Sequence, residues 1–114
     1  MDDCLFCKIA AGEIPADRVY ETDSVVVFRD INPQAPLHVL VIPRKHISTV
    51  NDIAGDDAGL VGKMVLAAQQ VAQNEGYAES GYRLVMNCNE DAGQTVFHIH
   101  LHLLAGRSLS WPPG

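Results

Sequence analysis

A segment of alternating histidine and apolar residues, Phe97–Leu104, restricts the fold of this chain more than any other stretch. In an extended strand His98, His100 and His102 share one face, and the aliphatic residues between them share the other. The apolar face anchors such a strand on a hydrophobic core. Three imidazoles add little to packing, because a buried polar group without a partner costs about 1–3 kcal/mol. The pattern therefore predicts a strand whose histidine face lines a functional site, with neighbouring imidazoles roughly 7 Å apart.

The length and composition of the chain indicate a single globular domain. Its 114 residues suffice for one core, and 47% are hydrophobic against 19% charged. A formal net charge of −6 excludes a generally basic surface for polymeric nucleic acid, so a phosphate-bearing ligand has to be small. We expect no signal peptide and no membrane association, since no apolar run approaches roughly 18 residues. Three cysteines are too few for a disulfide scaffold and indicate a reducing cytoplasm.

A long helix and about five strands are predicted from the remaining patterns. The helix runs from Asp56 or Asp57 to Glu75, because an aspartate can cap its N-terminus and Gly76 can end it. Few helices separate the strands, so we predict an α+β fold with an antiparallel sheet. A short helical turn is expected at residues 4–9, a hairpin-like stretch from Tyr20, and strands at 25–28, 38–42 and 82–86. Apolar residues three and four apart predict a core-facing helical stripe: Leu60, Val61, Met64, Val65, Ala68, Val71 and Ala72.

Three imidazoles on one face are typical of two kinds of site. They can bind zinc and activate a water molecule, or a central imidazole can attack an electrophile and form a covalent intermediate. Gly93, Gln94 and Thr95 directly precede the histidine segment. A glycine lets backbone N–H groups approach an anion, and the next two side chains add donors. This neighbourhood favours nucleophilic attack on phosphorus, where charge develops on the non-bridging oxygens.

The segment His98–Leu104 is similar to the His-φ-His-φ-His-φ-φ signature of the histidine triad (HIT) superfamily, in which φ is apolar. Residues 30–36, 43–47, 93–97 and 111–114 resemble its Hint branch, and the likeness extends from about Leu5 to Gly114. The resemblance implies a single HIT domain over residues 1–114. It also implies a five-stranded antiparallel sheet with one long and one short helix, continued across a homodimer.

The resemblance further implies a purine nucleoside phosphoramidate hydrolase, similar to an adenosine 5′-monophosphoramidase. Such an enzyme releases AMP or GMP and an amine through a nucleotidyl-histidine intermediate, and needs no cofactor for catalysis. One alternative is a nucleotide-binding regulatory or scaffold protein with slow or no turnover. Another is a zinc-dependent hydrolase that uses His98, His100 and His102 as ligands.

Site residues follow from motif position. His100 would be the nucleophile, His102 would bind the phosphate and assist the leaving group, and His38 would support the triad. Thr95 keeps the hydroxyl where serine is commoner, and its added methyl alters the space for the leaving group. For Asp30 and Asn87 the alternative is a plain turn role, and for His38 a satisfied core histidine. The implied substrate-binding set is Phe28 and Ile31 near the base, Asp30 at the ribose, Asn87, Gly93, Gln94, Thr95, His100 and His102 around the phosphate, and Trp111 at the leaving group.

Cys4 and Cys7 lie one helical turn apart and can supply half of a tetrahedral zinc site. The likeness to bacterial relatives implies His46 and His98 as the other half. With zinc bound, His98 would be a ligand, leaving His100 and His102 to the chemistry. The alternative is a pair of inert reduced thiols, since a lone Cys-x-x-Cys is weak evidence for a metal.

Overall fold

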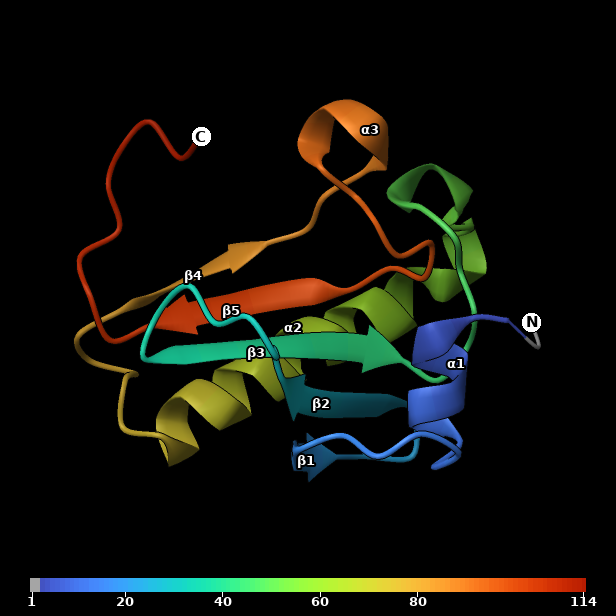
Figure 1. Ribbon diagram of the computed structural model, residues 1–114, viewed down its shortest axis with the longest axis horizontal. Helices are drawn as coiled ribbons and strands as arrows, with labels where there is room; N and C mark the ends of the chain where they lie inside the picture. The colour runs from blue at the N-terminus through green and yellow to red at the C-terminus, as the bar shows by residue number, and fades with distance from the viewer. Residues whose placement is uncertain (1–2) are drawn as a thin grey trace.

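A five-stranded antiparallel sheet forms the centre of the computed structural model, which describes residues 3–114 (Figure 1). The strand order is β1-β2-β3-β5-β4, and every pairing is antiparallel. The predicted α+β class is confirmed. The elements are α1 (Leu5–Ala10), β1 (Arg18–Glu21), β2 (Val25–Arg29), β3 (Leu37–Pro43), the 3₁₀ turns η1 (Val50–Asp52) and η2 (Gly55–Asp57), α2 (Ala58–Asn74), β4 (Tyr82–Val85), α3 (Asn89–Ala92) and β5 (Leu101–Ala105).

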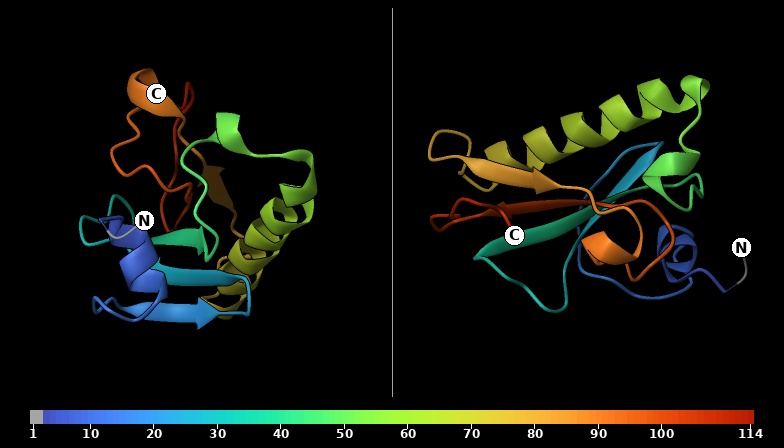
Figure 2. Two further views of the ribbon diagram at one scale, coloured as in Figure 1. Left: turned by 90° about the vertical axis from the view of Figure 1, so that its right-hand side faces the viewer. Right: turned by 90° about the horizontal axis from the view of Figure 1, so that it is seen from above.

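The two helices α1 and α2 cover opposite faces of the sheet (Figure 2). Alternation along β2 and β3 supplies an apolar layer to each face, as expected for strands buried on both sides. The face under α2 carries the larger core, which includes Val39, Val41, Ile99 and Leu103. The face under α1 carries a smaller core of Phe6, Ile9, Ala10, Val26, Phe28, Leu40 and Ile42. Within residues 3–114, no helix is both long and apolar enough to cross a membrane.

Helix α2 ends as predicted but begins differently. Gly76 has φ +86°, and the Tyr77 N–H donates to the Ala72 carbonyl, which gives a Schellman C-cap. The helix starts at Ala58, and the side chain of Asp57 does not cap it. That carboxylate instead accepts from the Ala54 N–H and from Lys45 Nζ at 2.6 Å, so it fixes the preceding 3₁₀ turn.

The predicted stripe of α2 is wrong at one position. Val65 is 43% exposed, whereas Ala67 is buried. A sheet is a broad surface, so the buried face of α2 includes Ala67 on one side of Met64 and stops short of Val65 on the other.

The predicted strand over residues 97–104 is only half correct, because β5 begins at Leu101. Its neighbour β3 ends at Pro43, which has no N–H, and the last register pair joins Val41 to Leu101. Before that pair the chain bends, and the Ile99 N–H donates to the Ile47 carbonyl instead. His98 and His100 therefore lie on an irregular segment, while Ile99 still points into the main core.

Candidate functional site

The two central strands bring the histidines together on the α1 face of the sheet. In the register of β3 and β5, Leu40 is opposite His102 and His38 is opposite Leu104. Leu40 belongs to the core under α1, so His38, two residues earlier, and His102, opposite Leu40, have side chains on that same face. Both rings thus come from adjacent strands inside the sheet, each of which is paired on both sides.

A hydrogen-bond chain determines the tautomers of His38 and His102. The Gln34 N–H donates to His38 Nδ1 at 3.0 Å, so a neutral His38 has its proton on Nε2. That Nε2–H faces His102 Nδ1 at 2.9 Å, and Asp30 Oδ2 lies 3.4 Å from it. His102 Nδ1 therefore accepts, which leaves the proton of His102 on Nε2, the ring nitrogen opposite His38.

The His100 ring is held in the opposite tautomer. Its Nδ1–H donates to the His98 carbonyl at 2.8 Å, so Nε2 carries a free lone pair. Phe6 packs edge-on against this ring, with centroids 5.1 Å apart and planes at 90°. The rings of His100 and His102 lie 5.1 Å apart, closer than an ideal strand would give. A nucleophilic nitrogen thus lies beside a ring that carries an N–H donor.

Burial keeps His38, His98 and His102 neutral. It lowers the pKa of His102 to about 4, with further lowering by charge on His100 and His38. Burial also lowers the pKa of His38, although the Asp30 carboxylate opposes this. The pKa of His98 is lowered for the same main reason. Near neutral pH these rings have the uncharged forms that the hydrogen bonds require.

His98 faces away from His100 and toward the N-terminal cysteines. Its Nε2–H donates to the Pro43 carbonyl at 2.7 Å, and its Nδ1 lies 3.4 Å from Cys4 Sγ and 3.5 Å from Cys7 Sγ. His46 Nδ1 lies 3.3 Å from Cys7 Sγ, and its Nε2 lies 3.2 Å from Ser48 Oγ. A hydrogen bond at Nε2 therefore holds each of these two rings with its Nδ1 directed at the thiols.

The Cys4, Cys7, His46 and His98 cluster has the dimensions of a tetrahedral zinc site. Their four ligand atoms all lie within 4.8 Å of one another. Typical Zn–S and Zn–N bonds at tetrahedral angles place sulfur and nitrogen about 3.6 Å apart, close to the separations found here. Burial and the neighbouring Cys4 raise the pKa of the Cys7 thiol to about 11, which a bound cation would reverse. These residues fit a structural zinc ion.

A HIT domain family model matches residues 11–109. The chain belongs to the HIT domain family. It is 51% identical over 108 residues to the purine nucleoside phosphoramidase of Escherichia coli (strain K12), covering 95% of this chain and 91% of that protein. The family and the antiparallel five-stranded fold implied by the sequence resemblance are thereby confirmed.

Solved structures agree with this assignment. A HIT family hydrolase from Legionella pneumophila superimposes with a TM-score of 0.96 at 57% identity, covering 98% of this chain and 100% of that one. A histidine triad protein from Clostridium difficile gives 0.94 at 44% identity, with 96% of each chain covered. The histidine triad nucleotide-binding protein of Candida albicans gives 0.82 at 31% identity over 96% of this chain and 83% of that one.

The triad of this HIT protein does not form a three-histidine metal site. His98 Nδ1 faces the cysteines, and its other nitrogen is bonded to Pro43. Asp30, His38 and His102 do lie close enough to share an ion. A metal on His38 Nε2 would require a proton on Nδ1, where the Gln34 N–H already donates. The geometry therefore opposes the zinc-hydrolase alternative.

Gly93, Gln94 and Thr95, which the sequence predicts to face an anion, lie in the loop before the triad, and Gln94 differs from that prediction. Gly93 follows α3 with φ +87°, a conformation that favours glycine, and the Thr95 side chain is exposed. Gln94 is buried, and its amide donates to the carbonyls of Ser48 and Val96. Both N–H groups of that amide are thus bonded within the protein, so Gln94 braces the loop instead of offering a free side-chain donor.

The remaining predicted residues lie at different depths. Phe28 is buried and contacts Phe6 with ring centroids 5.5 Å apart, while Asn87 is partly buried beyond the end of β4. Asp30 accepts from the Asn32 N–H and stays beside His38. Ile31 and Trp111 are 101% and 81% exposed, so the fold of this chain does not bury them at the triad.

Sequence reasoning missed Phe6 and Ser48. Phe6 contacts His98 as well as His100, at centroid distances of 6.0 and 5.1 Å. Its place between the two cysteines was the only available signal, because the residue type alone indicates core. Ser48 orients His46, and its place two residues after that histidine could have suggested it.

Proposed function

We propose that this HIT protein hydrolyses purine nucleoside phosphoramidates to AMP or GMP and an amine. The observation that carries the proposal is the pair of opposite tautomers, with a free lone pair on His100 Nε2 and a proton on His102 Nε2. The printed name of its relative from Escherichia coli, purine nucleoside phosphoramidase, supports the choice of substrate. No bound metal is required for the steps that follow.

The reaction proceeds in two displacements at phosphorus. His100 Nε2 attacks, the P–N bond breaks with its electron pair on nitrogen, and the amine leaves neutral after taking the proton of His102 Nε2. The phosphorylated His100 ring keeps its Nδ1–H and is positive, and this charge offsets the negative charge of the His102 imidazolate that remains after the proton has left. Water then attacks phosphorus and returns a proton to His102, and the bond to His100 breaks.

Other side chains bind the substrate in this proposal. Asp30 accepts from the ribose hydroxyls, and Phe28 and Ile31 line the base side. Asn87, the backbone at Gly93 and the Thr95 hydroxyl hold the phosphate and the leaving nitrogen, in a loop that Gln94 braces. Trp111 shapes the leaving-group pocket. The position of Asp30 directly after β2 and beside His38 supports its role.

Trapping tests the function directly. An aminoalkyl-AMP substrate is mixed with the protein at low pH, and mass spectrometry locates the adduct. We expect release of the amine and a nucleotidyl group on His100. His100→Ala should bind AMP and release no amine. Turnover by that variant contradicts the proposal, and binding of AMP by the unchanged protein without turnover favours the regulatory alternative.

We further propose a structural zinc ion on Cys4, Cys7, His46 and His98. It would join α1 to the irregular segment before β5 and so fix the position of Phe6. The sulfur–nitrogen separations support it, and so do the hydrogen bonds that hold the His98 ring at Pro43 and the His46 ring at Ser48. Elemental analysis of protein purified without added metal should find near-stoichiometric zinc. Its absence would favour reduced thiols.

A homodimer in which the sheet continues between subunits completes the proposal. Strand β4 lies at one edge of the sheet, and the exposed Ile31 and Trp111 are suited to contact a ligand or a second subunit. Light scattering after gel filtration tests it, and a monomer mass would refute it. We also propose that residues 1–114 form one HIT domain and that it works in the cytoplasm, where its three cysteines stay reduced and form no disulfide.

A further inference from the structure

We propose that Arg107 is a positioning residue, which holds the loop of residues 30–36 so that the Gln34 amide sets the tautomer of His38 and thereby the proton on His102. The inference rests on the proposed function, because it concerns the proton that the leaving amine takes. It extends that function to the turn after β5, which contains no triad residue.

The chain of contacts is continuous from the turn to the triad. Arg107 Nε donates to the Gln34 carbonyl at 2.9 Å. The Gln34 N–H donates to His38 Nδ1 at 3.0 Å, and His38 Nε2–H donates to His102 Nδ1 at 2.9 Å. Gln34 is thus held at both of its backbone groups, one by the arginine and one by the imidazole.

The loop depends on such an anchor because it has few others. Residues 31–34 and Pro36 are exposed, and Pro33 and Pro36 have no N–H to donate. Its internal bonds run from the Asn32 N–H to Asp30 and from the Gln34 side chain to the Asn32 carbonyl. These bonds shape the loop without tying it to β5.

A close backbone approach provides a second anchor at the same turn. Gly106 has φ +98°, and a Cβ atom there would lie 2.7 Å from Pro36 Cβ. The loop therefore packs directly on the turn that presents Arg107. Any side chain at position 106 pushes Pro36 away and displaces Gln34 with it.

The tautomer matters because a neutral imidazole carries one proton. With the Gln34 N–H at Nδ1, that proton is on His38 Nε2 and points at His102. Without this donor, His38 can hold its proton on Nδ1 and accept at Nε2 from His102. The proton of His102 is then on Nδ1, and its Nε2 has nothing to give to the leaving amine.

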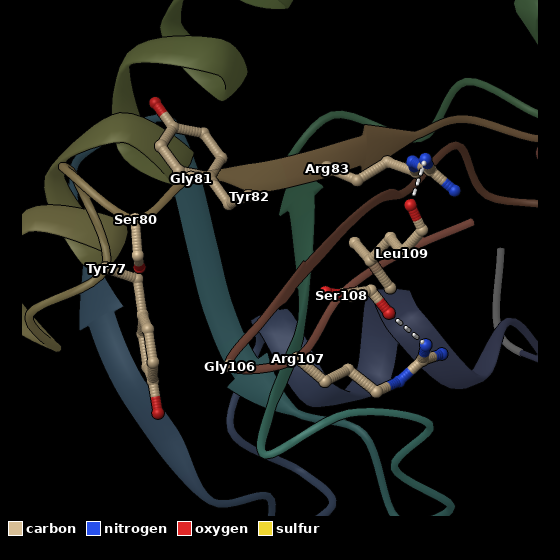
Figure 3. A pocket seen from close by; sticks show the side chains of 9 residues that line it. All are labelled: Tyr77, Ser80, Gly81, Tyr82, Arg83, Gly106, Arg107, Ser108 and Leu109. Atoms are coloured by element: carbon tan, nitrogen blue, oxygen red, sulfur yellow. Dashed lines mark hydrogen bonds between the residues drawn. The ribbon is translucent and has the colours of Figure 1, made fainter. Parts of the chain in front are cut away.

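The neighbouring Arg83 serves as a natural control. Both arginines line an open pocket of about 550 Å³ beside the C-terminal segment, and Figure 3 shows them on either side of Ser108 and Leu109. Arg83 donates to the Leu109 and Ser110 carbonyls, and Arg107 Nη1 to the Ser108 carbonyl. Among the hydrogen bonds of the described residues, two side chains outside the loop reach Gln34, those of Arg107 and His38, and Arg83 is not one of them.

Two substitutions separate the hydrogen bond from packing. Arg107→Met places a methyl group where Nε lies, and Arg107→Gln places an N–H donor there. Long-range ¹H–¹⁵N correlation spectra of the full-length protein with ¹⁵N-labelled histidine show which ring nitrogen bears hydrogen. We expect Arg107→Met to move part of the His38 proton to Nδ1 and lower kcat about 3- to 10-fold with KM little changed.

Arg107→Gln and Arg83→Met should both keep the His38 tautomer of the unmodified protein. Gly106→Ala should shift it as Arg107→Met does, and provides an independent test if that variant does not fold. An unchanged His38 tautomer in Arg107→Met or Gly106→Ala overturns the inference, as does the same defect in Arg107→Gln. The spectra need no substrate, so they decide this point even if the phosphoramidase function itself fails.

Discussion

Acidification tests whether the His102 ring is as desolvated as its place in the sheet implies. Burial and charge on its neighbours lower its pKa from 6.5 to about 4. Between about pH 6.5 and 4, His102 therefore binds a proton in the unfolded chain but not in the folded protein, so the free energy of unfolding falls as the pH falls. Above about pH 6.5 both states are neutral at this residue, and it adds no pH dependence.

The magnitude follows from the pKa difference. One pKa unit corresponds to about 1.36 kcal/mol, which gives at most about 2.5 kcal/mol between pH 7 and 4.5. The ring is only partly buried, and solvent screening reduces this to about 1–1.5 kcal/mol. His102→Asn is the matched variant, because the amide oxygen can accept from His38 Nε2–H where Nδ1 did and the side chain does not titrate.

Urea unfolding at several pH values measures the effect. Far-UV circular dichroism is the suitable probe, since the single tryptophan, Trp111, is 81% exposed and reports poorly on folding. The free energy of unfolding of the unmodified protein should fall relative to His102→Asn by about 1–1.5 kcal/mol from pH 7 to 4.5. If the difference in free energy of unfolding between the two proteins stays constant with pH, or changes in the other direction, the desolvation of this ring is refuted.

Three further experiments address the site. His102→Ala should lower kcat for an aminoalkyl-AMP by about 10²–10⁴-fold, as expected for a lost proton donor, and an unchanged rate would contradict its role. Gly93→Ala forces a left-handed φ on a residue that has a side chain and should lower the free energy of unfolding by about 1–2 kcal/mol. Gly62→Ala in α2 is the control and should change the free energy of unfolding by no more than about 1 kcal/mol. Cys7→Ala should lose bound zinc and melt at a lower temperature, while Cys88→Ala should keep its metal content; equal zinc in both would exclude the four-residue site.

Much of the fold was predictable because its signals are local. Periodicity located α2 and its C-terminal Gly76, and runs of β-branched residues located β2 and β3. Prolines placed the loop of residues 30–36. Errors occurred where a distant partner decides the outcome. The N-terminal boundary of α2 depends on Lys45, which engages Asp57, and the start of β5 depends on where β3 ends.

The candidate site was likewise predictable only in part. The sequence by itself determined the residue types, namely three alternating histidines, a glycine-led loop and a Cys-x-x-Cys pair that match one family. It could not assign an environment to each ring, because alternation gives all three histidines the same face.

Only the tertiary structure gives the three histidines different environments. It turns His98 toward Cys4 and Cys7, leaves His100 a free nitrogen, and gives His102 a proton through His38. Hydrogen-bond partners up to 94 residues apart in the chain make these choices, and such partners are set by how strands and loops pack. Chemical identity is local to the sequence, whereas the protonation and direction of each imidazole are properties of the assembled fold.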